Sequence, residues 1–190
     1  MFTERMALAD DCATWIEFNR EFMAGEIKDE DLWNSTDQVS DEQFAETFSK
    51  ALKAEDMISI LIFEEDGKPV GFANLMTVFS VWTHGLALII DDLYLREECR
   101  GKGCGRQAMV MIEEFAKERG CKRLQFQSEF TNPDAMKFYM AVGYTPTDMK
   151  FYVKYLDMHR DIEISEKEIS QGKTKDAVES LDELRKHYEL

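Results

Sequence analysis

The chain has 190 residues, of which 44% are hydrophobic, so it can form one domain with a sizeable core. Its formal net charge of −15 argues against nucleic acid as a partner, because the phosphate backbone attracts basic proteins. The sequence has no apolar run of roughly 18 residues, and its start lacks a basic leader followed by an apolar stretch. We therefore expect no membrane partner, no secretion and a cytoplasmic location.

The acidic residues are concentrated near the N-terminus. Residues 1–60 contain 15 acids and 5 bases, a balance of −10, whereas residues 61–156 are close to neutral. Solubility alone explains such a bias, but a negative field would also collect cationic ligands. The 4 cysteines show no C-x-x-C pair and no histidine at ligand spacing, so we expect free thiols and no bound metal.

The N-terminal part of the chain indicates one strand and two helices. Asp10 and Asp11 are favourable N-caps for the first helix, and Gly25 marks its end. Ser40–Gln43 is a capping box that opens the second helix. The expected elements are a strand over 2–8, a helix ending at Gly25, a polar loop over 26–39 and a helix over 41–52.

The next part of the chain predicts a meander of strands followed by alternating helices and strands. The expected strands cover 57–63, 70–79, 86–95, 124–127 and 151–156, and the expected helices cover 107–119 and 132–142. This order indicates an α+β fold with a mixed, mostly antiparallel central sheet flanked by helices. A helical crossover joins the central strands.

A change of pattern near residue 157 predicts a domain over 1–156 and a helical C-terminal extension over 157–190. In the extension, Lys175–Glu189 has one apolar and one charged face, so it should pack on the fold or on a second copy of the chain. We therefore expect a homodimer. The alternative is a helix that docks another protein.

The stretch Asp91–Arg106 carries the strongest chemical signal. An apolar strand ends in two carboxylates and leads into Arg100-Gly-Lys-Gly-Cys-Gly105, a basic turn with three alternating glycines. Such a turn leaves backbone N–H groups uncovered at a helix start, where the helix dipole favours anions. We interpret it as a pyrophosphate cradle. The G-x-x-x-x-G-K-[ST] pattern of a P-loop is absent, and no βαβ unit precedes the turn as in a Rossmann fold.

This turn fits the R-x-x-G-x-G motif of the GCN5-related N-acetyltransferase (GNAT) superfamily, and two other segments agree. Ile90–Leu95 resembles the family's acidic strand end, and Asn132–Tyr144 resembles its N-x-x-A-x-x-x-Y…G-[FY] segment. The resemblance covers about residues 2–156. It implies a GNAT-like fold and transfer of an acetyl group from acetyl-CoA to an amine.

The resemblance also implies a donor site. The pantetheine arm would bond to the backbone of Leu93–Leu95, where this strand splays from 125–127, and the pyrophosphate would lie on the glycine turn. Arg96 would add positive charge, and the amide after Leu93 would hold the thioester oxygen. The expected cofactor-binding residues are Leu93, Tyr94, Leu95, Arg100, Gly101, Lys102, Gly103, Cys104, Gly105, Arg106 and Asn132.

Acetyl transfer needs a base for the amine and an acid for the departing thiolate. A protonated aliphatic amine has a pKa of about 10.4, so Asp91 and Asp92 are candidate bases, either directly or through water. Strand alternation places them on opposite faces, and we favour Asp91 on the acceptor side. By its place in the motif, Tyr139 is the candidate acid. Core packing is the alternative for Tyr139, and helix capping is the alternative for Asn132.

The expected acceptor is a small-molecule amine with several positive charges. Phe79-Ser80-Val81-Trp82 before an acidic strand resembles the polyamine and diamine acetyltransferase branch, and carboxylates with aromatic faces suit polycations. The expected acceptor-binding residues are Trp33, Trp82, Asp91 and Glu26, the last in an acidic loop over 26–31. For Trp82 the alternative is packing on the sheet. Aminoglycosides and protein or peptide amines are alternative acceptors, and a non-catalytic acyl-CoA-binding module is the alternative from another class.

Overall fold

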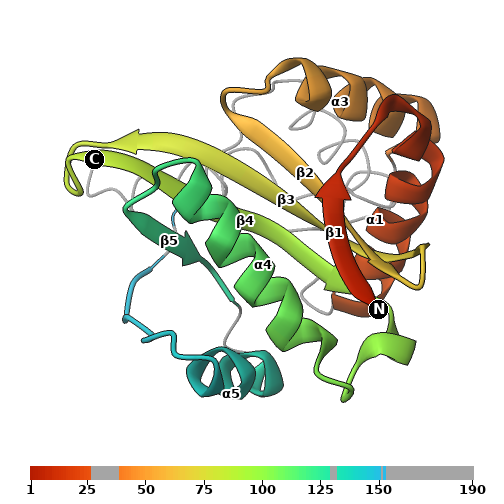
Figure 1. The fold of residues 1–190 in the computed structure, drawn as a ribbon. Coiled ribbons are helices and arrows are strands. Elements are labelled where there is room, and N and C mark those ends of the chain that lie inside the picture. Colours follow the sequence, from red (N-terminus) through yellow and green to blue (C-terminus); the bar gives the residue numbers. More distant parts are fainter. Residues whose placement is uncertain (27–38, 129–131, 151, 153–190) are drawn as a thin grey trace, which may run out of the picture. The chain divides into compact units, whose positions relative to one another are not determined.

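The structure, a computed structural model, describes residues 1–26, 39–128, 132–150 and 152 (Figure 1). Within these residues, five strands form one sheet in the order β1-β2-β3-β4-β5. The first four strands pair antiparallel, and β5 pairs parallel with β4 after the crossover helix α4. The predicted α+β fold with a mixed, mostly antiparallel sheet is confirmed.

The elements lie close to their predicted positions. The described strands are β1 (Phe2–Met6), β2 (Ile58–Glu65), β3 (Lys68–Ser80), β4 (Gly85–Leu95) and β5 (Arg123–Phe126). The described helices are α1 (Cys12–Glu26), α3 (Asp41–Lys53), α4 (Cys104–Glu118) and α5 (Pro133–Ala141), with short 3-10 turns η1 (Ala9–Asp11) and η3 (Glu97–Cys99). None of the described helices is long and apolar enough to cross a membrane.

Two local expectations have different outcomes. The capping box of α3 is confirmed, because the Ser40 hydroxyl accepts from the Gln43 amide at 3.3 Å and the Gln43 side chain accepts from the Ser40 amide at 2.8 Å. Asp11 does not cap α1 as expected. It ends η1 instead and accepts two hydrogen bonds from the Arg5 guanidinium, at 2.7 and 2.8 Å.

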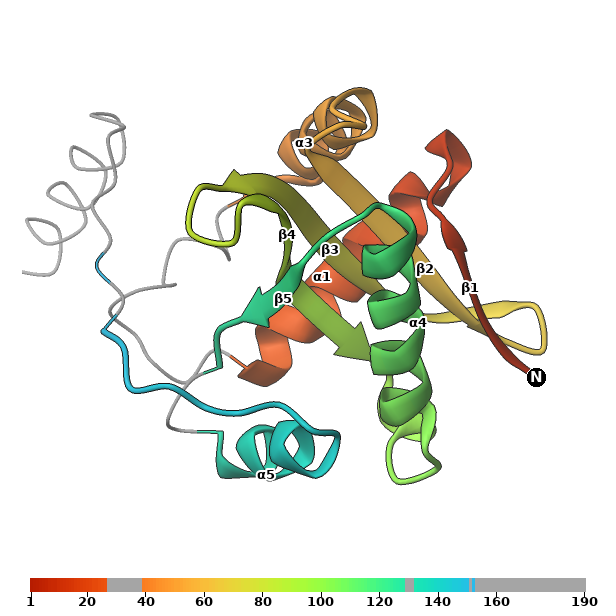
Figure 2. The same cartoon turned by 60° about the vertical axis from the view of Figure 1, so that its left-hand side comes forward.

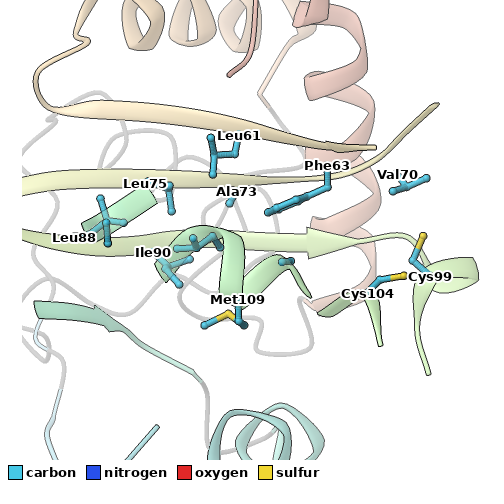
Figure 3. Packing of buried hydrophobic residues seen from close by; sticks show 13 residues of the cluster. Leu61, Phe63, Val70, Ala73, Leu75, Leu88, Ile90, Cys99, Cys104 and Met109 are labelled. Carbon is cyan, nitrogen blue, oxygen red and sulfur yellow. The ribbon is translucent and has the colours of Figure 1, made fainter. Parts of the chain in front are cut away.

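Helices cover both faces of the sheet (Figures 1 and 2). On one face α4 packs against β2, β3 and β4, and Figure 3 shows Leu75, Ile90 and Met109 in this layer. On the other face α1 and α3 contribute a largely aromatic layer that includes Trp15 and Phe48. The central strands β2, β3 and β4 therefore carry apolar side chains on both faces of the sheet, as their nearly continuous apolar sequences predict.

Contacts divide the chain into two units, Met1–Pro146 and Thr147–Leu190. The strand expected over 151–156 and the helix expected over 175–189 fall outside the described residues. The expected boundary after residue 156 and the role of the extension therefore stay predictions.

Candidate active site

The predicted cradle lies between η3 and the first turn of α4. Gly101 and Gly103 have φ angles of 72° and 88°, in the left-handed region that other residues rarely adopt. Gly103 is the N-cap of α4 and has no side chain to cap the helix, so the first amides of α4 are left for another acceptor. A β-carbon at either glycine would meet no atom within 4 Å. The turn therefore fits a phosphate group in both its geometry and its dipole.

Buried side chains hold this turn against the core. Cys99, at the end of η3, and Cys104, the first residue of α4, flank the turn, are 0% and 3% exposed, and lie near each other (Figure 3). Burial raises the pKa of the Cys99 thiol to about 11, so the thiol stays protonated. A β-carbon on Gly105 would lie 3.2 Å from the Phe138 ring, so this glycine lets α5 approach α4 closely. Among the described residues, no His, Cys, Asp and Glu side chains group as a metal site requires.

The cations around the turn are not equivalent. Arg96 binds α1 instead of the turn: its guanidinium donates to the Glu21 carboxylate at 2.8 and 3.0 Å and lies over the Phe18 ring. The expectation that Arg96 supplies charge to the cradle is therefore wrong. The remaining cations of the turn occupy exposed positions, and they are Arg100, Lys102 and Arg106.

β4 and β5 separate after Ile90, before β4 reaches the turn. Their pairing runs from Ala87 opposite Arg123 to Ile90 opposite Phe126, and there β5 ends. β4 continues to Leu95 and pairs with β3 along its other edge. Over 91–95, the β5-side edge of β4 therefore has no strand partner among the described residues, and its backbone N–H and C=O groups are available to a ligand. This geometry agrees with the splay expected at Leu93–Leu95.

A β-bulge lies at the two aspartates. Leu75 pairs with Ile90 and Asn74 pairs with Asp92, so Asp91 is an extra residue without its own partner on β3. Ile90 packs in the layer under α4, whereas Asp92 bonds to Asn74 in a chain that continues to α1. Because a bulge interrupts strand alternation, the argument that placed Asp91 and Asp92 on opposite faces is wrong.

Side chains from two other elements hold Asp92. Asn74 Nδ2 donates to Asp92 Oδ2 at 2.7 Å, and Trp15 Nε1 donates to Asn74 Oδ1 at 3.0 Å. Burial raises the pKa of the Asp92 carboxyl, the hydrogen bond from Asn74 lowers it, and the charge of Asp91 raises it again. Partial burial also raises the pKa of Asp91, although its side chain reaches solvent. Both carboxyls therefore bind a proton more tightly than usual, which suits a base.

No family motif points to Asn74 or Trp15. A weak signal exists for Asn74, because it is an amide within the apolar run Val70–Phe79, and a polar group inside a central strand needs a partner. Trp15 gives no such signal, since an aromatic residue on a helix face is ordinary core. Its link to Asn74 depends on how α1 crosses the sheet.

Asn132 is the N-cap of α5, and Tyr139 lies in the last turn of the same helix. The Tyr139 ring centroid is 4.2 Å from that of Phe126, where the pairing of β4 with β5 ends. Tyr139 therefore lies beside the opening between the two strands, and its role as an acid stays a prediction. Asn132 Oδ1 accepts from the Ala135 amide at 3.0 Å, so Asn132 caps the helix, and its contact with the donor also stays a prediction.

The expected acceptor-binding residues are not brought together. Trp82 is 90% exposed in the turn between β3 and β4, so it does not pack on the sheet. The strand from Gly85 to Asp91 covers about 20 Å at about 3.3 Å per residue. Within one chain Trp82 is thus remote from Asp91, which corrects the expectation that both line one acceptor site. Trp33 and the side chain of Glu26 lie outside the described residues.

Comparisons with known proteins agree with this geometry. Residues 21–144 match the model of the acetyltransferase (GNAT) family. An uncharacterized N-acetyltransferase of Bacillus subtilis (strain 168), YhfO, is 36% identical over 107 residues, which cover 56% of this chain and 72% of that protein. A thialysine N-epsilon-acetyltransferase of Bos taurus is 28% identical over 145 residues, which cover 73% of this chain and 81% of the bovine protein.

A solved structure extends the likeness to the fold. An aminoglycoside N-acetyltransferase in complex with CoA superposes with a TM-score of 0.65 at 15% identity, covering 83% of this chain and 96% of that one. The family match includes the glycine turn, both aspartates and Tyr139. The chain therefore belongs to the acetyltransferase (GNAT) family and is an N-acetyltransferase.

Proposed function

We propose that this enzyme moves the acetyl group of acetyl-CoA to a primary amine of a small polycationic acceptor, by direct attack while both substrates are bound. One observation carries the proposal. The unpaired end of β4 begins at two partly desolvated carboxylates and leads into an open, basic glycine turn. A donor with a pyrophosphate and an acceptor with a positive charge require such opposite surroundings.

Acetyl-CoA suits the first half of the site. Its pyrophosphate would accept hydrogen bonds from the uncapped amides at the start of α4, with charge from the exposed cations Lys102 and Arg106. Its pantetheine amides would pair with the free edge of β4 over Leu93–Leu95. The amide of Tyr94, which follows Leu93, is then the candidate donor to the thioester oxygen.

The second half of the site provides the proton chemistry. At pH 7 only about one aliphatic amine in 10³ is neutral, so removing a proton raises the reactive fraction. We assign this role to Asp92, directly or through water, and the binding of the cation to the more exposed Asp91. The neutral nitrogen then forms a bond to the carbonyl carbon, the carbon–sulfur bond breaks, and the nitrogen releases its second proton to solvent as the amide forms. Tyr139 gives its phenolic proton to the departing thiolate, as in general acid catalysis, and recovers a proton from solvent.

The class of acceptor is inferred from charge. The balance of −10 over residues 1–60 would attract a polycation. Similar proteins include a thialysine acetyltransferase and an aminoglycoside acetyltransferase. Thialysine, aminoglycosides and peptide amines are therefore the alternative acceptors. We also propose a cytoplasmic homodimer in which the extension over 157–190 contributes contacts. Analytical ultracentrifugation of the full chain tests this assembly, and a monomer at all concentrations would contradict it.

A thiol-release assay with acetyl-CoA tests the function. Polyamines, thialysine, aminoglycosides, amino acids and lysine peptides are compared by kcat/KM, and we expect polyamines to rank first. Asp92→Asn should lower kcat/KM about 10²-fold, the ordinary contribution of a base, whereas the exposed control Asp56→Asn should not. A different best amine would reassign the acceptor. Binding of CoA without thiol release from any amine would favour a non-catalytic module.

A further inference from the structure

Three polar side chains from three elements form a continuous hydrogen-bonded chain behind the bulge. Trp15 on α1 donates to Asn74 on β3 at 3.0 Å, and Asn74 donates to Asp92 on β4 at 2.7 Å. Trp15 is 4% exposed and lies among aromatic rings, with the Phe48 centroid at 5.2 Å. These two hydrogen bonds therefore connect the buried aromatic layer of the fold to a carboxylate of the candidate active site.

The chemistry of the three side chains determines which atoms donate and which accept along these hydrogen bonds. An indole N–H can only donate a hydrogen bond, so it must meet the oxygen of the Asn74 amide. The amide NH₂ group of Asn74 is then turned toward Asp92, where it can only donate. A hydrogen bond from a neutral donor to a carboxylate favours its ionised form. Trp15 thus determines that Asn74 presents a donor, instead of an acceptor, to Asp92.

We propose that Asn74, oriented by Trp15, is a positioning residue that binds Oδ2 of Asp92 and leaves Oδ1 to take the proton of the acceptor amine. The inference rests on the proposed role of Asp92 as the base. Within the described residues, Oδ2 is the oxygen occupied by a side-chain donor. A fixed carboxylate with one committed oxygen is already in the geometry that proton transfer needs, so no rotation is required during the reaction.

The surroundings of Asp92 make this donor important. Asp91 on the same strand is the charged group that acts on Asp92, and its negative charge favours the protonated form, as does burial. The facing elements β3 and α1 contribute the neutral groups Asn74 and Trp15. Asn74 is therefore the group that opposes both effects. Without it, Asp92 would stay protonated to a higher pH and would be unable to accept a proton there.

The test compares pH profiles of kcat/KM in the full chain. We expect Asn74→Leu to shift the acid limb upward by about one pH unit, a tenfold loss below that limb, with a much smaller loss at alkaline pH. Trp15→Phe keeps an aromatic ring but removes the indole N–H, so it should shift the limb in the same direction by less. Carbon-13 NMR of the aspartate carboxyls gives the Asp92 titration without any substrate.

Thr77→Val is the matched control on the same strand. The Thr77 hydroxyl is buried and has no hydrogen-bond partner among the described residues, so this variant removes a polar group without breaking a contact. It should change neither the acid limb nor the Asp92 titration. If Asn74→Leu does not fold, Trp15→Phe carries the NMR measurement.

Four results decide the matter. A shifted acid limb together with a shifted Asp92 titration supports the positioning role. A uniform loss at every pH with an unchanged titration would mean that the chain of hydrogen bonds only braces the fold, and this overturns the proposal. An active variant with an unchanged limb overturns it as well. If the Asp92→Asn variant acetylates amines with the same kcat/KM as the wild type, Asp92 is not the base, and the role on which the proposal rests is removed.

Discussion

Substitution of Gly103 by alanine isolates the cradle from the rest of the site. Gly103 has a φ of 88° and is the N-cap of α4. A β-carbon there would meet no atom within 4 Å, so the substitution introduces no clash. Its whole effect comes from the backbone, because alanine disfavours left-handed φ values by about 1–2 kcal/mol.

The two outcomes of this strain can be separated. If the turn keeps its conformation, the strain lowers the free energy of unfolding by about 1–2 kcal/mol. If the turn relaxes in the free enzyme, stability is preserved, but CoA must restore the left-handed conformation. The affinity then falls by up to about 5- to 30-fold, which is the same free energy expressed as a ratio. Expressed as free energies, the loss of stability and the loss of CoA affinity should therefore add up to about 1–2 kcal/mol, the amount by which alanine disfavours a left-handed φ.

Gly67→Ala provides the matched control. Gly67 lies in the β2–β3 hairpin with a φ of 75°, and a β-carbon there would also meet nothing within 4 Å. Urea unfolding measures the stability of each variant, and calorimetry measures CoA binding. We expect Gly67→Ala to lose stability without losing affinity. The cradle assignment fails if Gly103→Ala binds CoA as tightly as Gly67→Ala and is also clearly less destabilised than that control.

Two further predictions concern α5 and α1. Tyr139→Phe should lower kcat by about 10²-fold at nearly constant CoA affinity, because the ring still packs on Phe126 while the acidic proton is lost; unchanged turnover in the thiol-release assay would remove the acid role. Hydrogen bonds from Arg96 lower the pKa of Glu21 below its ordinary 4.5, so this pair stabilises the fold above that pH and its contribution is lost as the pH falls through the lowered value. Melting curves from pH 7 to pH 3 should therefore show Arg96→Met less stable than wild type at neutral pH and a convergence of the two in acid. A constant difference at every pH would contradict this linkage.

Much of the fold follows from local sequence chemistry. The capping box at Ser40 and the Asp66–Gly67 turn are specified by neighbouring residues, so their positions are predictable. The start of α4 was expected three residues too late. Gly103 is itself the N-cap, and glycines that suit an open turn hide the beginning of a helix from a propensity argument.

The acceptor side of the site was harder to predict. Strand alternation fails at Asp91, because a bulge depends on how β3 pairs with β4 and has no sequence signature here. The contacts of Asn74 with Trp15 and of Arg96 with Glu21 join residues 59 and 75 positions apart, so only the assembled fold reveals them. Trp82 belongs to a motif close to Asp91 in sequence, yet an extended strand separates the two residues in space.

Deletion of Asp91 tests whether the bulge serves function instead of stability. Because Asp91 is the extra residue, its removal leaves Leu75 opposite Ile90 and Asn74 opposite Asp92 in an uninterrupted ladder. Ile90 would still face α4, Asp92 would still face Asn74, and no buried apolar side chain would be lost. We therefore expect a folded protein with a melting temperature close to that of wild type.

The activity of the deletion variant should nevertheless collapse. A bulge bends its strand and increases the local twist, and this one lies where β4 separates from β5. A straighter β4 would move the backbone of Leu93–Leu95 relative to the glycine turn, and a displacement of about 1 Å is enough to lower kcat/KM about 10²-fold. CoA affinity by calorimetry should fall as well, and this loss separates the effect of the bulge from the loss of the Asp91 carboxylate, which serves the acceptor. A variant that is stable and fully active would show that the bulge positions neither substrate, whereas an unfolded variant would refute the register on which the prediction depends.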